Sequence, residues 1–330
     1  MTNSGSERPG EFELIAELFA PLATAPGAFG LTDDAAVVAP PAGHELVVTM
    51  DALIEGVHFF ASDPPDLIAR KALRVNLSDL AAKGCAPLGY LMALSIPRKL
   101  EMSWLRAFAR GLAEDQQIFG ISLFGGDTTA TPGPLTIAIT ASGHLPVGRM
   151  LRRSGAKPGD VVFVSGTIGD AGGGLACLKG EGAHLSNIDR DHLVRRFQLP
   201  EPRTSLGPSL IGVASASLDV SDGLLADLGH IAAASAVRVV VEAERVPLSP
   251  ALIALWPQAK ERIVRAVTAG DDYEIAFTAP PSSRATIVAA SARAGLPVAE
   301  IGRVETGQGV TLLDNGGQES PVNRRGYVHF

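Results

Sequence analysis

The chain has 330 residues, of which 46% are hydrophobic and 19% are charged, and its formal net charge is −7. This composition is typical of a folded, soluble protein and excludes an intrinsically disordered chain. The negative charge, with no basic run longer than two residues, argues against nucleic acid as a partner, because affinity for nucleic acid rests on Lys and Arg contacts to phosphates.

The length predicts two domains. The apolar runs, such as 90–96 and 161–164, suit buried strands and fall short of a membrane span, so we expect no membrane partner. Residues 1–10 are polar and contain no hydrophobic signal segment. The two cysteines, Cys85 and Cys177, lack metal-ligand spacing. We therefore expect a cytoplasmic protein with reduced thiols, and a disulfide is the less favoured alternative.

The first half of the chain shows alternating helix and strand patterns. Apolar residues at helical spacing predict helices at 12–22, 66–83 and 103–119, the last capped by Ser103. Short apolar or alternating stretches predict strands at 37–39, 46–50, 88–96, 121–124 and 135–145. Gly, Pro, Arg and Lys are concentrated at 146–160, and we place the domain boundary there, with an N-terminal domain of residues 1–145.

The second half, residues 146–330, repeats this mixture. Helices are predicted at 171–179, 205–213, 224–235 and 282–294. Strands are predicted at 161–164, 237–241, 274–278 and in a stretch ending near Asp219. Because strands and helices alternate in both halves, the expected fold class is α/β or α+β with two domains.

Acidic clusters flanked by small residues recur along most of the chain. Converging carboxylates repel one another, by roughly 4 kcal/mol for two charges 4 Å apart at an effective dielectric near 20. A pocket that gathers them needs cations, and Mg²⁺ is commonly bound through a few carboxylates plus substrate phosphates. The clusters are Thr32-Asp33-Asp34, Met50-Asp51, Asn76-Leu77-Ser78-Asp79, Gly125-Gly126-Asp127, Asp219-Val220-Ser221-Asp222 and Asp271-Asp272.

Taken singly, most of these motifs also have a structural explanation. For Asp51 a functional role is favoured, because this residue ends an apolar strand and ligand-binding sites in open sheets gather at strand ends. Asp219 is not required by any capping role. The sequence lacks the P-loop, nucleophile-elbow and metalloprotease motifs. The structural alternatives are a solvated turn for Asp33-Asp34, an exposed helix face for Asp79, a hairpin turn for Gly125-Gly126, a helix cap for Ser221 or Asp222, and surface positions for His58 and Arg153.

Taken together, the motifs resemble the thiamine-monophosphate kinase family, which belongs to an ATP-binding superfamily that includes aminoimidazole ribonucleotide synthetase. The resemblance runs from Gly10-Glu11-Phe12 to residues 326–330. It rests on an ordered series of segments, namely 33–35, 51–59, 71–79, 125–129, 153–160, 219–224 and 271–274.

This resemblance implies a role for each matching residue. The implied Mg²⁺ ligands are Asp34, Asp51, Asp79, Asp127, Asp219 and Asp222, with Thr49 and Met50 at further metal-contacting positions. The implied ATP contacts are Gly126, Asp127, Arg153 and Ser221, and the implied substrate contacts are His58, Asp271 and Tyr327. The implied catalytic set is Asp51, Asp79 and Asp127.

Five positions depart from the family pattern, and two of them, Thr32 and Ala269, stand where glycines are usual. Met50 replaces a threonine, Asp271 stands where a glutamate is usual, and Phe119 stands where a tyrosine near ATP is frequent. No ATP contact is transferred to Phe119. The resemblance also implies an N-terminal domain that forms a homodimer through its sheet, with ATP at the junction of the two halves.

The resemblance implies an enzyme that transfers the γ-phosphoryl group of ATP in line to thiamine monophosphate, assisted by several Mg²⁺ ions. One alternative is another enzyme of the superfamily, similar to selenophosphate synthetase or aminoimidazole ribonucleotide synthetase. A second is a non-catalytic relative that binds nucleotide or metal. The kinase is favoured because a reactive Cys in a glycine-rich N-terminal segment, typical of selenophosphate synthetases, is missing from the sequence.

Overall fold

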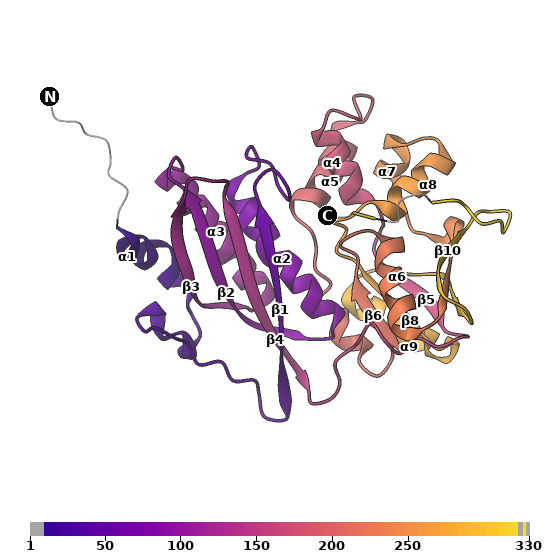
Figure 1. Cartoon of the computed structure of the whole chain (residues 1–330), viewed down its shortest axis with the longest axis horizontal. Coiled ribbons are helices and arrows are strands. Elements are labelled where there is room, and N and C mark those ends of the chain that lie inside the picture. Colours follow the sequence, from indigo (N-terminus) through magenta and orange to yellow (C-terminus); the bar gives the residue numbers. More distant parts are fainter. Residues whose placement is uncertain (1–9, 323–325, 328–330) are drawn as a thin grey trace. The chain divides into compact units, whose positions relative to one another are not determined.

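The computed structural model describes residues 10–322 and 326–327, which divide into two units (Figure 1). Within the described residues, unit 1 comprises the chain up to Asn76 together with Pro87–His144, and unit 2 comprises Leu77–Ala86 and the chain from Leu145 onward. The boundary drawn from the sequence lies between residues 145 and 146, and it did not separate the short segment 77–86. Residues 1–9, which make up most of the polar N-terminal segment, and residues 328–330, at the end of the family resemblance, lie outside the described part.

Unit 1 is built on a four-stranded sheet in the order β1-β4-β2-β3. The strands are β1 (His44–Ile54), β2 (Ala86–Pro97), β3 (Ser122–Thr131) and β4 (Thr136–Pro146). Strands β2 and β3 are parallel, with α3 (Met102–Phe119) between them in the sequence. Figure 1 shows α3 and α2 (Pro65–Ala82) on the same face of this sheet. The apolar spacing of α3 explains this placement, since Leu105, Phe108 and Leu112 all lie on its buried face.

Among the described residues of unit 1, no helix covers the other face of this sheet (Figure 1). Alternate residues of β1 point to one side, and three of them, Leu46, Val48 and Met50, are 39%, 57% and 63% exposed. Leu91 of β2 is another large apolar side chain that is exposed in unit 1. Strand β4 alternates between buried and half-buried residues along its length, as expected for a sheet with one packed and one open face.

Unit 2 contains a six-stranded sheet in the order β10-β7-β9-β5-β8-β6. Its strands are β5 (Val161–Ser165), β6 (Ala216–Asp219), β7 (Arg238–Glu242), β8 (Ile275–Ala279), β9 (Val298–Glu305) and β10 (Gly309–Leu313). The pair β10–β7 is parallel, and the other pairs are antiparallel. The helices of unit 2 are α4 (Asp170–Leu178), α5 (Asn187–Gln198), α6 (Leu224–Ser235), α7 (Pro250–Leu255), α8 (Ala259–Thr268) and α9 (Arg284–Ala294).

Both faces of the unit 2 sheet are buried. Along β5, Val162 and Val164 join a hydrophobic cluster that contains the apolar side of α6. Val161 and Phe163 point the other way and join a second cluster, to which α9 contributes. Because both of its faces are buried, β5 requires an unbroken apolar run, and residues 161–164 supply it. The two-domain mixed α/β class expected from the sequence is confirmed.

Several predicted elements differ in detail. The helix expected at 12–22 is a composite of α1 (Glu11–Leu14), a π turn (Ile15–Phe19) and a 3₁₀ turn (Ala20–Leu22). Pro21 explains part of this change, because it has no N–H to donate to an α-helical bond. The strand expected at 37–39 is wrong. Val37 instead donates its N–H to the carbonyl of Gly27, at 2.9 Å, within a loop.

The helix predictions also contained errors, and α7 and α8 were not predicted. Residues 205–213 form only a 3₁₀ turn (Gly207–Leu210), while the polar segment before them contains α5, whose N-cap Ser186 accepts the N–H of Asp189. The N-cap of α3 is Glu101 rather than Ser103. Among the described helices, none is both long and apolar enough to cross a bilayer.

The close approach of α3 to α2 generates a prediction at Gly111. A Cβ at this position would lie 2.3 Å from the carbonyl oxygen of Asp66. Gly→Ala normally stabilises a helix by about 1 kcal/mol, but here we expect Gly111→Ala to destabilise unit 1 by roughly 1–3 kcal/mol through overpacking. Thermal unfolding checks this, with Arg110→Ala as a control at an exposed position of the same helix. A midpoint for Gly111→Ala at or above that of the wild type would contradict the proposed packing.

Candidate functional site

A cavity of about 330 Å³ in unit 1 brings two of the predicted metal ligands together. Asp34, from the segment before β1, and Asp127, on β3, both line it, as does Gly126. The remaining wall is largely apolar and includes Phe12 and Leu123. The cavity thus combines carboxylates and an accessible backbone with apolar surface, which is the usual composition of a small-molecule site.

The Gly-Gly-Asp motif lies within a strand and not in a turn. Strand β3 continues from Ser122 to Thr131, and Gly126 pairs with Met92 of β2. The register shifts just before this point, so that Tyr90 pairs with Leu123 while the next residue of β2 pairs with Gly125. A β-bulge of this kind redirects side chains. A Cβ on Gly126 would lie 1.9 Å from the carbonyl oxygen of Met92, which explains the need for glycine here.

Asp51 lies on β1, at the opposite edge of the same sheet. Its backbone N–H donates to Oδ1 of the buried Asn76 at 3.1 Å, and Asn76 in turn donates to the carbonyl of Ala72. Two strands separate β1 from β3. At about 4.8 Å per strand, Asp51 and Asp127 belong to strands roughly 14 Å apart. Within unit 1, the sheet therefore does not place these two aspartates side by side, and their convergence on one metal cluster stays a prediction.

The predicted substrate contact His58 follows β1. Its Nδ1 accepts the N–H of Ile54 at 3.0 Å, and its carbonyl oxygen accepts a hydrogen bond from Nζ of Lys71, also at 3.0 Å. Thr49 and Met50, the other predicted metal-contacting residues, precede Asp51 on β1. Asp51, Asn76 and His58 are thus held by hydrogen bonds from more than one segment.

In unit 2 the predicted site residues gather around one loop. This acidic loop, residues 219–223, joins β6 to α6 and contains Asp219, Ser221 and Asp222. Asp271 donates its N–H to the carbonyl oxygen of Ser221 at 2.8 Å, and Tyr327 donates its N–H to that of Asp222 at 2.9 Å. The predicted ATP contact Ser221 is therefore tied through the backbone to the predicted substrate contact Asp271.

The backbone around Asp271 is strained. Asp271 has φ = 68° and Tyr273 has φ = 52°. Both values lie in the left-handed region, which residues other than glycine rarely adopt. The N–H of Tyr273 donates to the carbonyl oxygen of Val220 at 2.8 Å, so the acidic loop helps to hold this conformation. Strain of this kind concentrates at ligand sites, where surrounding bonds maintain it.

Asp219 and Asp79 form a carboxylate pair within unit 2. Asp219 is buried, and this burial, together with the Asp79 carboxylate, raises the pKa of Asp219 well above its ordinary value. The side chain of Ser78 and, less strongly, the ammonium group of Lys83 oppose the rise. Two carboxylates in this setting offer hard oxygen donors, which is the ligand chemistry that Mg²⁺ takes in proteins. The residues present therefore fit a divalent cation.

Arg153, a predicted ATP contact, is exposed and lies in a segment that runs beside β6. The N–H of Ser217 donates to the carbonyl oxygen of the preceding Arg152 at 2.8 Å. The guanidinium of Arg153 acts electrostatically on Lys83, which also interacts with both carboxylates of the pair. Arg153 thus lies near the Asp79–Asp219 pair, and its contact with ATP stays a prediction.

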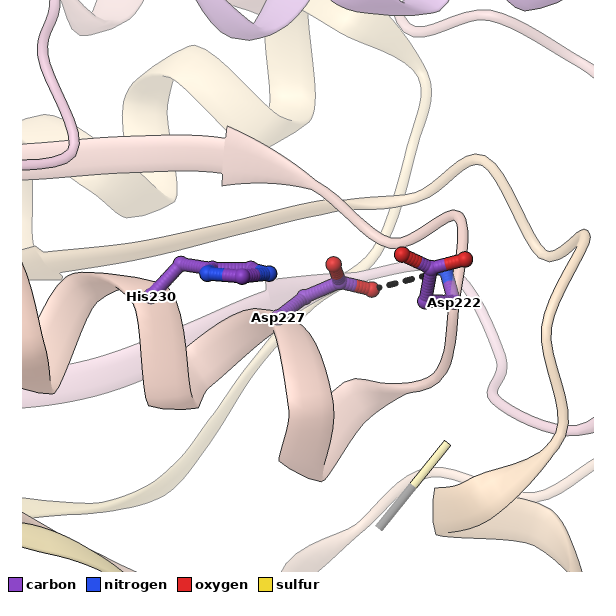
Figure 2. Close-up of side chains that lie close together, drawn as sticks. All are labelled: Asp222, Asp227 and His230. Atoms are coloured by element: carbon purple, nitrogen blue, oxygen red, sulfur yellow. Dashed lines mark hydrogen bonds between the residues drawn. The ribbon is translucent and has the colours of Figure 1, made fainter. Parts of the chain in front are cut away.

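Asp227 organises the acidic loop from within α6. Oδ2 of Asp227 accepts the backbone N–H groups of Ser221, Asp222 and Gly223 at 3.0–3.1 Å. Figure 2 shows this side chain between Asp222 and His230, and the ligand atoms of the three residues lie within 4.8 Å of one another. Because one oxygen of Asp227 already accepts three N–H groups, its clearest role is to hold the loop.

Sequence reasoning missed Asp227 and Lys83. The only local signals were an acidic residue in the first turn of a helix after a glycine, and a lysine four residues after Asp79. Neither signal is specific, because acidic residues are common in first turns and i, i+4 pairs of opposite charge are common on helices.

The pKa of Asp227 generates a prediction. Burial and then the Asp222 carboxylate raise this pKa from 3.8 to about 7, against the three N–H donors. The folded protein then binds a proton that the unfolded chain has released between those two values, so the contribution of Asp227 to stability falls as the pH rises from 4 to 7. We expect the difference in melting temperature between the wild type and Asp227→Asn to decline over that range, in EDTA, and to level off above pH 7.

The exposed Asp191 of α5 provides the matched control, since Asp191→Asn should show no such trend. A difference between wild type and Asp227→Asn that grows with pH would show that the N–H donors dominate over burial.

Comparisons with known proteins cover both units. Residues 32–145 match the family described as AIR synthase related protein, N-terminal domain, and residues 157–315 match the corresponding C-terminal domain. The thiamine-monophosphate kinase of Caulobacter vibrioides is 45% identical over 97% of this chain and 91% of its own length.

Two solved structures are also similar. The thiamine-monophosphate kinase of Stenotrophomonas maltophilia superposes with a TM-score of 0.80 at 41% identity, covering 88% of this chain and 91% of that one. The structure described as AaThiL complexed with AMPPCP and TMP has a TM-score of 0.77 at 33% identity, covering 99% of this chain and 100% of that one. With matches of this length and identity, the chain belongs to the thiamine-monophosphate kinase family, within the AIR synthase related proteins.

Proposed function

We propose that this protein transfers the γ-phosphoryl group of ATP to the phosphate of thiamine monophosphate and releases thiamine diphosphate and ADP. The observation that carries the proposal is the similarity, over 99% of the chain, to a family member complexed with AMPPCP, an ATP analogue, and TMP. The curated relative that is 45% identical bears the name of the same activity.

The chemistry suits a site rich in carboxylates. The attacking atom is a phosphate oxygen that is already ionised at neutral pH, so the reaction needs no strong general base. The main obstacle is repulsion between two anions, which has to be overcome by positioning and by compensating charge. Mg²⁺, when bound, would supply positive charge that offsets the repulsion between the phosphates.

The chain's own residues would hold the metal, nucleotide and substrate in three groups. Asp51, Asp79 and Asp127 are the proposed catalytic carboxylates, and Arg153 would bind phosphate through its guanidinium fork. The strained loop at Asp271 and the segment at Tyr327 would orient thiamine monophosphate with His58. The proposed metal ligands are Asp34, Thr49, Met50, Asp51, Asp79, Asp127, Asp219 and Asp222, and the proposed ATP contacts are Gly126, Asp127, Arg153 and Ser221.

We also propose that the protein is a homodimer and that its unit 1 sheets face each other. The support is the open sheet face, where Leu46, Val48 and Met50 form an exposed apolar stripe along β1. Exposed apolar patches of this kind mark interaction surfaces. A second copy of the same sheet is a natural occupant, because a two-fold contact pairs a surface with itself. The ATP position at the junction of the two halves and a cytoplasmic location remain part of the same proposal.

Product formation tests the activity. Purified protein incubated with ATP, Mg²⁺ and thiamine monophosphate should form thiamine diphosphate, measured by chromatography. Asp127→Asn should remain folded and lose about 100-fold or more in kcat, because it removes a charge that helps to bind metal at the transferring phosphate. The exposed Asp191→Asn is the matched control and should keep wild-type turnover. ATP consumption without thiamine diphosphate would refute the proposed acceptor, and a normal kcat in Asp127→Asn would remove Asp127 from the mechanism.

Light scattering tests the dimer. The wild type should have twice the chain mass of 34.2 kDa, and Val48→Lys should shift it towards the monomer, because a charge would be buried in the middle of the apolar stripe. Val288→Lys, at an exposed valine of α9 in unit 2, should leave the dimer intact. A wild-type monomer, or a Val48→Lys protein that stays dimeric, would argue against this interface.

A further inference from the structure

Lys83 lies near the Asp79–Asp219 pair and interacts electrostatically with both carboxylates. It directly follows α2, and its backbone N–H donates to the carbonyl oxygen of Asp79 at 3.1 Å, one helical turn earlier. Its Nζ reaches β6 and donates to the carbonyl oxygen of Ser217 at 3.0 Å. Ser217 is two residues before Asp219 and therefore projects from the same face of the strand. The half-buried ammonium group thus connects the chain segments that carry the two acids.

Four neighbouring residues act electrostatically on Lys83, and Cys85 has the smallest effect of the four. The carboxylates of Asp219 and Asp79 stabilise the ammonium group, while burial and the guanidinium of Arg153 disfavour it. When both are ionised, the two acids carry more negative charge than one lysine offsets. A protonated lysine has three donors and no lone pair, so it cannot ligate a metal. It can only compete with a metal for the same carboxylates.

We propose that Lys83 is a built-in counter-ion that weakens divalent cation binding at Asp79 and Asp219 until a nucleotide polyphosphate is present. Before the nucleotide binds, the ammonium offsets part of the negative charge and lowers the attraction for Mg²⁺. The polyphosphate then adds several negative charges, which outweigh the lysine and favour Mg²⁺ at the pair. This inference rests on the proposed function only in taking Asp79 and Asp219 as metal ligands.

Mg²⁺ titrations of the folded protein test the proposal, with binding followed by calorimetry in the absence and in the presence of AMPPCP. Lys83→Met removes the charge and keeps a long, flexible side chain, whereas Lys83→Arg keeps the charge. Without nucleotide, Lys83→Met should bind Mg²⁺ about tenfold more tightly than the wild type, since a unit charge has left the site. The factor by which AMPPCP increases Mg²⁺ affinity should fall correspondingly. Lys83→Arg should retain wild-type behaviour.

Two further variants complete the design. Lys179→Met removes a charge from an exposed lysine elsewhere in unit 2 and should leave Mg²⁺ affinity unchanged. Asp219→Asn should lower the Mg²⁺ affinity measured by calorimetry, which would show that the titration reports binding at the Asp79–Asp219 pair. If Lys83→Met does not fold, Lys83→Gln replaces it in the same comparison.

Unchanged or weaker Mg²⁺ binding in the neutral Lys83 variant would overturn the proposal, and so would an unaltered Mg²⁺ response in Asp219→Asn. These readouts contain no thiamine monophosphate. A wild-type protein that binds Mg²⁺ and AMPPCP as described but forms no thiamine diphosphate would therefore contradict the proposed function and leave the role of Lys83 supported.

Discussion

Confined negative charge is the constraint on which the unit 2 site depends. Asp219 is buried beside the Asp79 carboxylate, and neither burial nor the neighbouring acid favours its ionised form. The pair persists because the surroundings compensate it, in part through Lys83. A group of carboxylates that is costly alone becomes useful when a cation and a polyphosphate have to be bound together. The same electrostatic balance explains why the protein can have a net charge of −7 and still belong to a family of ATP-dependent kinases.

The second feature is the rigidity of the acidic loop. Asp227 anchors three successive N–H groups of the loop, and the loop's carbonyl oxygens accept N–H groups from Asp271, Tyr273 and Tyr327. Segments that are about fifty and one hundred residues away in the sequence are therefore joined by main-chain hydrogen bonds. Main-chain bonds position a site independently of side-chain rotamers, which suits a transfer between two phosphates that must be aligned closely.

The sequence predicted those regular elements that have strong apolar patterns, and it missed α7, α8, β9 and β10. The helix at 224–235 is confirmed as α6, and the strand at 161–164 is confirmed within β5, because both have strong apolar patterns that tertiary contacts reinforce. The predictions at residues 205–213 and 37–39 were wrong, since short apolar stretches fit helix, strand or packed loop equally well. The polar helix α5 was missed for the opposite reason, since its few apolar positions, such as Leu193 and Phe197, show their role only when the rest of the core is present.

For the site, the sequence alone determined which residue types are available and in what order, and this was enough to identify the family. Only the tertiary structure decided the environment of each residue. It placed Gly126 and Asp127 in a bulged strand instead of a turn, put two strands between Asp51 and Asp127, and revealed Asp227 and Lys83 as partners of the acidic residues. The physical reason is that burial, strand register and neighbouring charges arise from contacts between segments far apart in the chain. A sequence motif contains only residues that are close together along the chain.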